Sequence, residues 1–273
     1  MKFIDRLKRA WAAQQSLLCV GLDPDPARLP GQLGAYAHPI FEFGRAIVDA
    51  TADLVCAFKP QIAFYAAARA EDQLEMTIAH IRRHHPAIPV ILDAKRGDVG
   101  STAAMYAREA FERYQADAVT VNPYLGSDAL APFLDYADKG VIVLCRTSNP
   151  GARDVQDIDS HGRKLYQLVA EKAARDWNGN ANVLLVVGAT YPQELGEIRA
   201  IVGDMPILVP GVGAQGGDVA AVLEHGATDD GTGLVISSSR AVLYAGGGSD
   251  YAQAARDAAL KLRDEINLYR NIK

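Results

Sequence analysis

Eight short apolar runs recur along the 273 residues, and they limit the possible folds more than any other feature. The runs are rich in Val, Ile and Leu without clean polar alternation, which is typical of strands covered on both faces. They lie at 16–23, 55–61, 90–96, 118–123, 141–146, 182–189, 206–213 and 233–240. Segments of helical periodicity separate them, among them 38–54, 62–84, 101–115, 160–176, 192–202 and 250–268. This alternation predicts a parallel sheet built from βα units.

Eight such units in about 250 residues match a closed (β/α)8 TIM barrel, with a doubly wound sheet as the alternative. No composition change and no Pro/Gly-rich linker divides the sequence, so we expect residues 1–273 to form a single domain. The N-terminal segment KFIDRLKRAWAAQQ is amphipathic and contains Asp5, which argues against a transit peptide. It therefore predicts an extra N-terminal helix packed against the barrel.

Composition excludes several classes of protein. Hydrophobic residues make up 49% and charged residues 22%, as in ordinary globular proteins, and the net charge of -5 argues against nucleic-acid binding. No apolar run approaches the roughly 18 residues of a membrane span.

The three cysteines are Cys19, Cys56 and Cys145. Their number is odd, and they lie in or beside apolar runs. We expect buried free thiols, a reducing compartment and a cytoplasmic location.

The six histidines show neither an H-E-x-x-H motif nor the Cys/His spacing of a zinc site, so we expect no metal centre. His84 and His85 end a helical segment just before Pro86, and we expect both to be solvated there.

Barrels of this kind carry their chemistry at the C-terminal ends of the strands. The polar residues at those predicted ends are Asp23, Lys59, Asp93, Lys95, Asn122, Arg146, Gln215 and Arg240. Buried charge is costly unless it is paired, so a ring of charges on an apolar framework indicates a site.

The strongest motif is LDAKRGDVGST at 92–102. Asp93 and Lys95 are two apart on a strand and should share one face, and Asp98 follows just past the strand end. Lys59 ends the preceding strand, and neighbouring strands lie about 4.8 Å apart. We therefore expect two lysines and two aspartates around one small volume. The alternative is a structural salt-bridge network.

A second motif is PGVGAQGGD at 210–218. Gly211, Gly213 and Gly216 fit G-x-G-x-x-G, but the next strand ends in Arg240 instead of the acidic residue of a dinucleotide site. The position matches the phosphate site formed by the loops after strands seven and eight of a barrel. Backbone N–H groups and Arg240 would bind the anion there. The alternative is a tight turn and a surface arginine.

Two further stretches offer substrate contacts. Residues 146–162 show no clear periodicity, which is typical of a lid or of a disordered surface loop. Ser148 and Asn149 in it could bond the polar edge of a heterocycle. Asp23, at the end of the first strand, could hold sugar hydroxyls or simply form a turn. Asn122 could simply cap or orient the active-site ring.

These residues carry a resemblance to a known family. The pieces GLDPDP, FKPQIAFY, LDAKRGDVGST, VNPYLG, CRTSNPG, PGVGAQGGD and SSSRAVLYAG follow one another between residues 21 and 246. In them the chain resembles the orotidine 5'-monophosphate decarboxylases, in the longer bacterial branch of that family. The D-x-K-x-x-D core is shared with a suprafamily of phosphate-binding barrels, whereas RTSNPG and PGVGAQGGD are typical of the decarboxylases.

The resemblance implies an enzyme that converts orotidine monophosphate into uridine monophosphate and CO2 in pyrimidine biosynthesis. It implies a cofactor-independent, metal-free reaction in a homodimer with shared active sites. The charged tetrad would comprise Lys59, Asp93, Lys95 and Asp98. Asp98, with Val99 and Thr102, would reach in from the partner subunit. Lys95 would stabilise and protonate a C6 carbanion, and Asp93 would face the substrate carboxylate.

The resemblance also implies the residues that bind the rest of the substrate. Asp23 and Lys59 would hold the ribose, and Ser148 would contact the pyrimidine. Gln215, Gly216 and Arg240 would bind the phosphate.

Three other functions remain open from the residues alone. A metal-dependent sugar-phosphate decarboxylase or epimerase could use the aspartates, although Lys59 and Lys95 would repel the metal. A Schiff-base aldolase could use Lys95 as its nucleophile. A nucleotide-sensing or scaffold protein on the same barrel would be expected to have lost part of the tetrad.

Overall fold

The computed structural model describes residues 1–212 and 217–270, and within them eight parallel strands form one sheet. The strands are β1 Leu18–Leu22, β2 Ala57–Pro60, β3 Ile91–Arg96, β4 Ala118–Val121, β5 Gly140–Arg146, β8 Val183–Val187, β9 Ile207–Pro210 and β10 Leu234–Ser238. Their order in the sheet is β2-β1-β10-β9-β8-β5-β4-β3. Each coincides with one of the eight apolar runs, so the strand predictions are confirmed.

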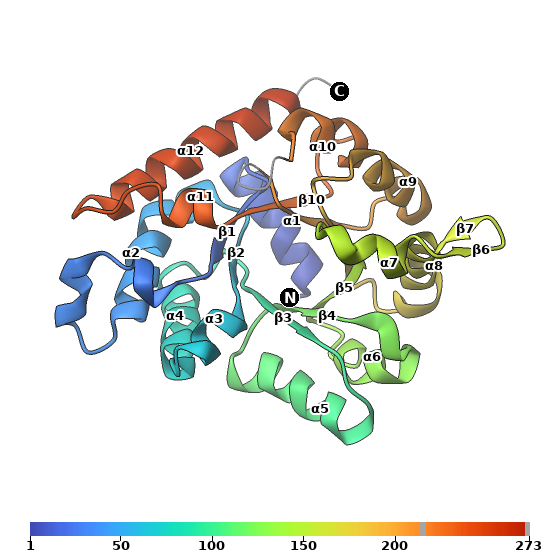
Figure 1. The fold of residues 1–273 in the computed structure, drawn as a ribbon, viewed down its shortest axis with the longest axis horizontal. Helices are drawn as coiled ribbons and strands as arrows, with labels where there is room; N and C mark the ends of the chain where they lie inside the picture. The colour runs from blue at the N-terminus through green and yellow to red at the C-terminus, as the bar shows by residue number, and fades with distance from the viewer. Residues whose placement is uncertain (213–216, 271–273) are drawn as a thin grey trace.

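The sheet closes between its two outer strands, β2 and β3. Single parallel bridges join Phe58 to Val90 and Gln61 to Asp93 across this seam. The result is a barrel with helices around it (Figure 1). The (β/α)8 prediction is therefore confirmed, and closure excludes the open, doubly wound alternative.

The strands are buried on both faces, as their composition predicts. Every residue of β1, β2, β4 and β8 is buried. The larger surrounding helices are α2 Pro39–Thr51, α4 Glu71–His84, α5 Gly100–Arg108, α6 Ser127–Leu134, α8 Leu165–Lys172, α9 Pro192–Val202, α10 Val219–Gly226 and α12 Tyr251–Arg270. Shorter helices are α3 Ile62–Ala67, α7 Arg153–Gln156 and α11 Arg240–Leu243.

The N-terminal segment forms helix α1, Phe3–Gln14, which confirms the extra helix. Phe3 and Trp11 are buried, and Phe3 lies against Gly140 at the start of β5, where a larger residue would clash. Arg6 forms an ion pair with Asp117, just before β4. Since both contacts lie at strand beginnings, α1 covers the N-terminal end of the barrel and leaves the opposite end open.

Two sequence predictions of helices are wrong in detail. The helix expected over 62–84 is broken into α3 and α4, and Arg69 between them has a left-handed φ of 53°. The helix expected from residue 160 begins only at Leu165, because a hairpin of β6 (Asp159–Ser160) and β7 (Arg163–Lys164) precedes it. The stretch 146–162 thus carries a short helix and half of a hairpin, so it is not structureless.

The described chain contains no helix that is both long enough and apolar enough to cross a membrane. Cys19, Cys56 and Cys145 are buried and unpaired, as expected. The expectation of two solvated histidines holds for His84, which is exposed, but is wrong for His85, which is half-buried against Asp49.

Candidate active site

Asp93 is the centre of a charged cluster at the C-terminal end of the barrel. Its Oδ2 accepts a hydrogen bond from Lys59 Nζ at 3.0 Å, and its Oδ1 accepts one from Lys95 Nζ at 2.6 Å. The hydroxyl of Thr120 donates a third, at 2.9 Å to Oδ1. Lys59 is 4% exposed and Asp93 is 7% exposed. The predicted convergence of charges therefore holds for these two lysines and one aspartate.

The cluster favours the charged forms of Asp93 and Lys59. Burial alone would raise the pKa of Asp93, but Lys59 and Lys95 lower it well below its usual value. Burial likewise opposes the charge of Lys59, yet Asp93 and then Asp23 raise the pKa of this lysine above its usual value. A carboxylate already bound to two ammonium groups has little attraction left for a metal ion.

The backbone at Lys95 departs from a regular strand. Its φ is +47°, in the left-handed region, and the pairing of β3 with β4 shifts between Leu92 and Arg96. Thr120 Oγ1 accepts hydrogen bonds from the N–H groups of Ala94 and Lys95, both at 2.9 Å. Strain of this kind persists only where its surroundings enforce it, and it is frequent at functional sites. The Lys95 side chain is 47% exposed, so its ammonium remains open to a ligand.

Sequence reasoning missed Thr120, although it contacts both the carboxylate and the strained backbone. The available signal was a single hydroxyl in the apolar run AVTVNP of β4. A buried Thr oxygen needs hydrogen-bond partners. The Thr120 hydroxyl donates to the Asp93 carboxylate and accepts the N–H groups of Ala94 and Lys95.

Asp98 does not join the cluster within its own chain. It is half-buried, and its Oδ1 accepts the N–H of Val99 at 2.8 Å. Within the described chain it has no cationic partner. Val99 and Thr102, at the start of α5, are exposed. The four-charge arrangement expected from the sequence is therefore a three-charge arrangement in a single subunit.

The loop after β1 contains a carboxylate oxygen without a hydrogen-bond partner among the described residues. This atom, Asp23 Oδ1, is buried. Tyr244 fixes the loop, because its hydroxyl accepts the N–H of Asp25 at 2.7 Å and donates to the Asp23 carbonyl at 3.3 Å. The guanidinium of Arg28 covers the Tyr244 ring at 3.7 Å. An acceptor held in this way suits a ligand hydroxyl.

Ser148 follows β5 and lies against Gly188, which follows β8. A Cβ added to Gly188 would come within 2.7 Å of the Ser148 Cβ, so only glycine allows this approach. Asn149 accepts a hydrogen bond from the Thr147 hydroxyl at 2.7 Å. Asn122 accepts the N–H of Tyr124 at 3.0 Å, which confirms a capping role for it.

The predicted ring of charges is wrong at Arg146. Its side chain is buried beneath the loop that follows β5, with Nη2 at 3.2 Å from Asp157 Oδ1. Its guanidinium lies 4.1 Å from the centre of the Tyr191 ring. Gln156, which also approaches Arg146, bonds the N–H of Thr147 at 2.9 Å. Arg146 therefore anchors the loop and is not part of the Asp93 cluster.

Arg240 is the first residue of α11 and is exposed, without an acidic partner in the part of the chain that the structure describes. The nearby glycine loop begins at Gly211, whose φ is +97°. Gly217, at its other end, donates its N–H to the Gly211 carbonyl at 3.4 Å. The expected site residues Gln215 and Gly216, and Gly213 of the same motif, lie outside the described residues.

Known proteins of one family resemble this chain in sequence and in fold. Residues 16–258 match the family model described as "Orotidine 5'-phosphate decarboxylase / HUMPS family". The chain is 63% identical over 270 residues to the orotidine 5'-phosphate decarboxylase of Azoarcus sp. (strain BH72), covering 99% of this chain and 100% of that one. It matches the Leishmania donovani OMP decarboxylase structure with a TM-score of 0.87 and 40% identity, covering both chains completely. It also matches the structure of Leishmania donovani UMP synthase with a TM-score of 0.89 and 42% identity. That match covers 100% of this chain and 57% of the UMP synthase chain. This chain therefore belongs to the orotidine 5'-phosphate decarboxylase / HUMPS family.

Proposed function

We propose that this chain catalyses the reaction for which its relatives are named, the decarboxylation of orotidine 5'-monophosphate to uridine 5'-monophosphate in pyrimidine biosynthesis. One observation carries the proposal. A buried carboxylate, Asp93, binds two lysine ammonium groups at the open end of the barrel, and one of these, Lys95, faces solvent. A positive charge fixed in this way supports a reaction in which negative charge develops beside Lys95.

Lys95 serves in this proposal as electrostatic stabiliser and proton donor. The bond between C6 and the carboxyl carbon breaks, CO2 leaves, and the electron pair stays on C6. The ammonium of Lys95 stabilises that pair and then transfers a proton to C6, giving the C–H bond of the product. Lys95 recovers its proton from solvent. Asp93 holds the ammonium in place through the 2.6 Å contact.

Asp93 would also repel the carboxylate of the substrate, but repulsion alone is too small to explain catalysis. Two unit charges about 4 Å apart interact by roughly 4 kcal/mol at an effective dielectric near 20. Enzymes commonly lower barriers by about 8–23 kcal/mol. Stabilisation of the transition state by Lys95, with binding energy from the phosphate, must supply most of the difference.

The rest of the substrate would lie along the ends of neighbouring strands. The unpartnered oxygen of Asp23 supports a role in binding the ribose hydroxyls, together with Lys59. Ser148 would contact the pyrimidine. Arg240, exposed at the end of the last strand, would bind the phosphate with Gln215 and Gly216.

The site would be completed in a homodimer. Asp98 lacks a cationic partner in the described part of its own chain, and Val99 and Thr102 beside it are exposed. These features support a dimer in which the Asp98 side chain extends into the active site of the partner subunit. The three unpaired cysteines support a reducing, cytoplasmic setting.

The direct test follows the ultraviolet absorbance of orotidine monophosphate with purified protein in excess EDTA. Turnover without metal supports the decarboxylase. Activity that appears only after Mg²⁺ is restored would instead favour a metal-dependent relative. Absence of turnover in both conditions would contradict the proposal, and trapping with borohydride would then test Lys95 as a Schiff-base nucleophile.

A further inference from the structure

Two histidines and one aspartate that take no part in the Asp93 cluster meet near the C-terminal ends of α2 and α4. Asp49 lies on α2, His80 on α4, and His85 immediately after α4. Asp49 Oδ1 lies 2.6 Å from His80 Nε2 and 2.9 Å from His85 Nε2. One ligand atom from each of the three residues lies within 4.8 Å of the others. This group is named the α2–α4 triad below.

We propose that the α2–α4 triad binds a divalent transition-metal ion of the Zn²⁺ type. Two imidazole nitrogens and one carboxylate oxygen form a donor set suited to zinc, whereas Mg²⁺ and Ca²⁺ prefer oxygen donors alone. With metal–ligand bonds of about 2.0–2.1 Å, tetrahedral ligands lie roughly 3.3 Å apart. The observed contacts of 2.6 and 2.9 Å are shorter than that spacing by less than about 1 Å, so the ligand atoms would separate only slightly around an ion.

The two oxygens of Asp49 have different surroundings, which favours a single metal-facing oxygen. Oδ2 lies 3.8 Å from Arg45 Nη1, whereas Oδ1 faces both imidazoles. Arg45 is itself held by Glu42 at 2.7 Å, so it orients the carboxylate without displacing the histidines. Partners of this kind, one step removed from a metal, fix the orientation of its ligands.

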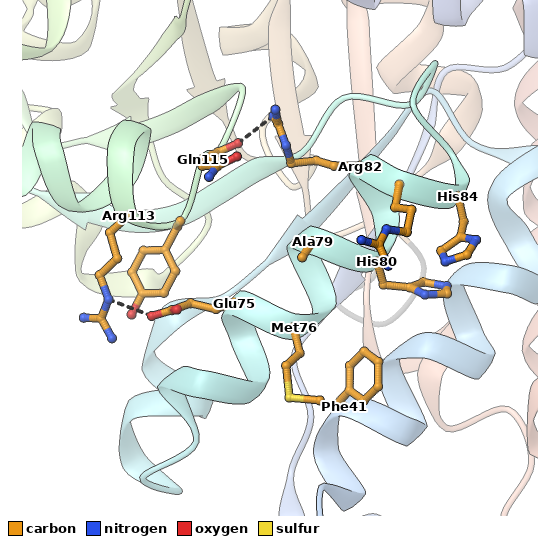
Figure 2. Close-up of a pocket in the computed structure, with 11 residues that line it drawn as sticks. Phe41, Glu75, Met76, Ala79, His80, Arg82, His84, Arg113 and Gln115 are labelled. Atoms are coloured by element: carbon orange, nitrogen blue, oxygen red, sulfur yellow. Dashed lines mark hydrogen bonds and ion pairs between the residues drawn. The ribbon is translucent and has the colours of Figure 1, made fainter.

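An ion at the triad could exchange with solvent. The side chains of His80, His85 and Asp49 are 12%, 23% and 41% exposed. A surface hollow of about 840 Å³ is lined by His80, and Figure 2 shows His84 beside it, with ring centres 4.5 Å apart. A second hollow, of about 470 Å³, is lined by Asp49 and His85. Three protein ligands and access from both hollows leave a fourth coordination position for water.

The sequence pattern could not reveal this site. His80 and His85 are five residues apart, and Asp49 comes from a different helix, 31 residues earlier than His80. The ligands meet only because α2 packs beside α4. A bound ion would therefore join two helices that hydrogen bonds already bring together, and it would favour the folded chain by mass action.

Isothermal titration calorimetry with ZnCl2 tests the proposal on the full chain. We expect one Zn²⁺ per chain, with affinity weakened by about tenfold or more in Asp49→Asn and in His85→Gln. His161→Asn is the matched control, because His161 is exposed in a hairpin turn with a left-handed φ that Asn tolerates. The cysteines are buried, so they do not compete for the ion in the folded protein.

Thermal unfolding gives a second readout. Zn²⁺ should raise the melting temperature of the wild-type chain and of His161→Asn, and should leave that of His80→Gln/His85→Gln unchanged. Absence of wild-type binding would overturn the site, as would equal stoichiometry and affinity in the double variant. Turnover in EDTA should be unaffected in every variant, so failure of this site leaves the proposed reaction untouched.

Discussion

Asp93 and Arg146 are both buried charges in strands of the same barrel, but they differ in how close and how exposed their partners are. Asp93 has three donors within 3.0 Å, and one of them, Lys95, is half-exposed. Arg146 is enclosed, with its acidic neighbours Asp157 and Glu194 at 3.2 and 3.9 Å. Its Nε has no hydrogen-bond partner among the described residues.

The difference in partners separates two roles. The Asp93 cluster presents a charge to a ligand, whereas Arg146 holds a loop in place. Short contacts fix the Lys95 ammonium while leaving it accessible, as electrostatic catalysis requires. The looser surroundings of Arg146 rely on packing and on the face of Tyr191. Burial of a charge at a strand end is therefore insufficient to identify an active site, and the accessibility of its partner is the better criterion.

The largest effect should come from removing the accessible charge. Lys95→Ala should lower kcat by about 10⁴-fold or more, because it removes both the electrostatic stabiliser and the proton donor. Binding of uridine monophosphate, followed by calorimetry, should survive. The control is Lys8→Ala, at an exposed lysine on α1, and its kcat should equal that of the wild type. Near-native turnover of Lys95→Ala would refute its assignment.

Asp93→Asn should cost stability as well as activity. It leaves Lys59 buried without its principal partner, and breaking such a pair costs about 3–5 kcal/mol of unfolding free energy. Denaturant unfolding measures the loss. Asp264→Asn breaks an exposed pair with Arg263 and should change stability by less than about 1 kcal/mol. Similar losses in both variants would contradict the description of the cluster as buried and tightly paired.

The difference in unfolding free energy between wild type and Asp93→Asn should shrink as the pH falls. Because folding lowers the pKa of Asp93, its contribution is fully present above the unfolded value of about 3.9. It should be lost as pH falls below that value toward the folded pKa. Unfolding titrations should therefore give a constant difference between about pH 5 and 8, and a shrinking one in more acidic solution. A difference that grows on acidification would contradict the lowered pKa.

Arg146→Met should have a smaller and more local effect. Lost hydrogen bonds to a charged group cost about 1.5–3 kcal/mol, and the partly exposed Asp157 can be solvated afterwards. Hydrogen exchange should quicken over residues 147–162, and kcat/KM should fall by about tenfold because the loop carries Ser148. A loss of turnover as severe as that of Lys95→Ala would erase the distinction between the two charges.

Thr120→Val should have the smallest overall effect, because it lowers turnover without loosening a loop. The variant keeps the side-chain shape but removes the hydroxyl that bonds Asp93 and the N–H of Lys95. We expect kcat to fall by about tenfold with KM nearly unchanged, and Thr120→Ser to restore it. Thr51→Val, at a buried threonine that bonds only within α2, is the control. Equal kcat in the two valine variants would remove Thr120 from the positioning of Lys95.

The sequence predicts the strands well because burial on both faces leaves a direct mark on composition. It predicts Lys59, Asp93 and Lys95 because side chains at neighbouring strand ends must be close. Thr120 and Tyr244 are not predictable in this way, since their roles depend on hydrogen bonds across strands and loops. Arg146 was misplaced because a strand-end position does not say whether a long side chain turns inward or outward.

The seam between β2 and β3 is held by isolated backbone bridges and by the Lys59–Asp93 ion pair that crosses it. Barrel closure and the proposed chemistry thus depend on the same side chains. Changing Lys59 or Asp93 alone leaves the other charge buried without its partner at the seam, so a compensating change has to accompany it. We therefore expect that, in a related barrel that keeps Asp93 but not Lys59, another group at the seam pairs with the carboxylate.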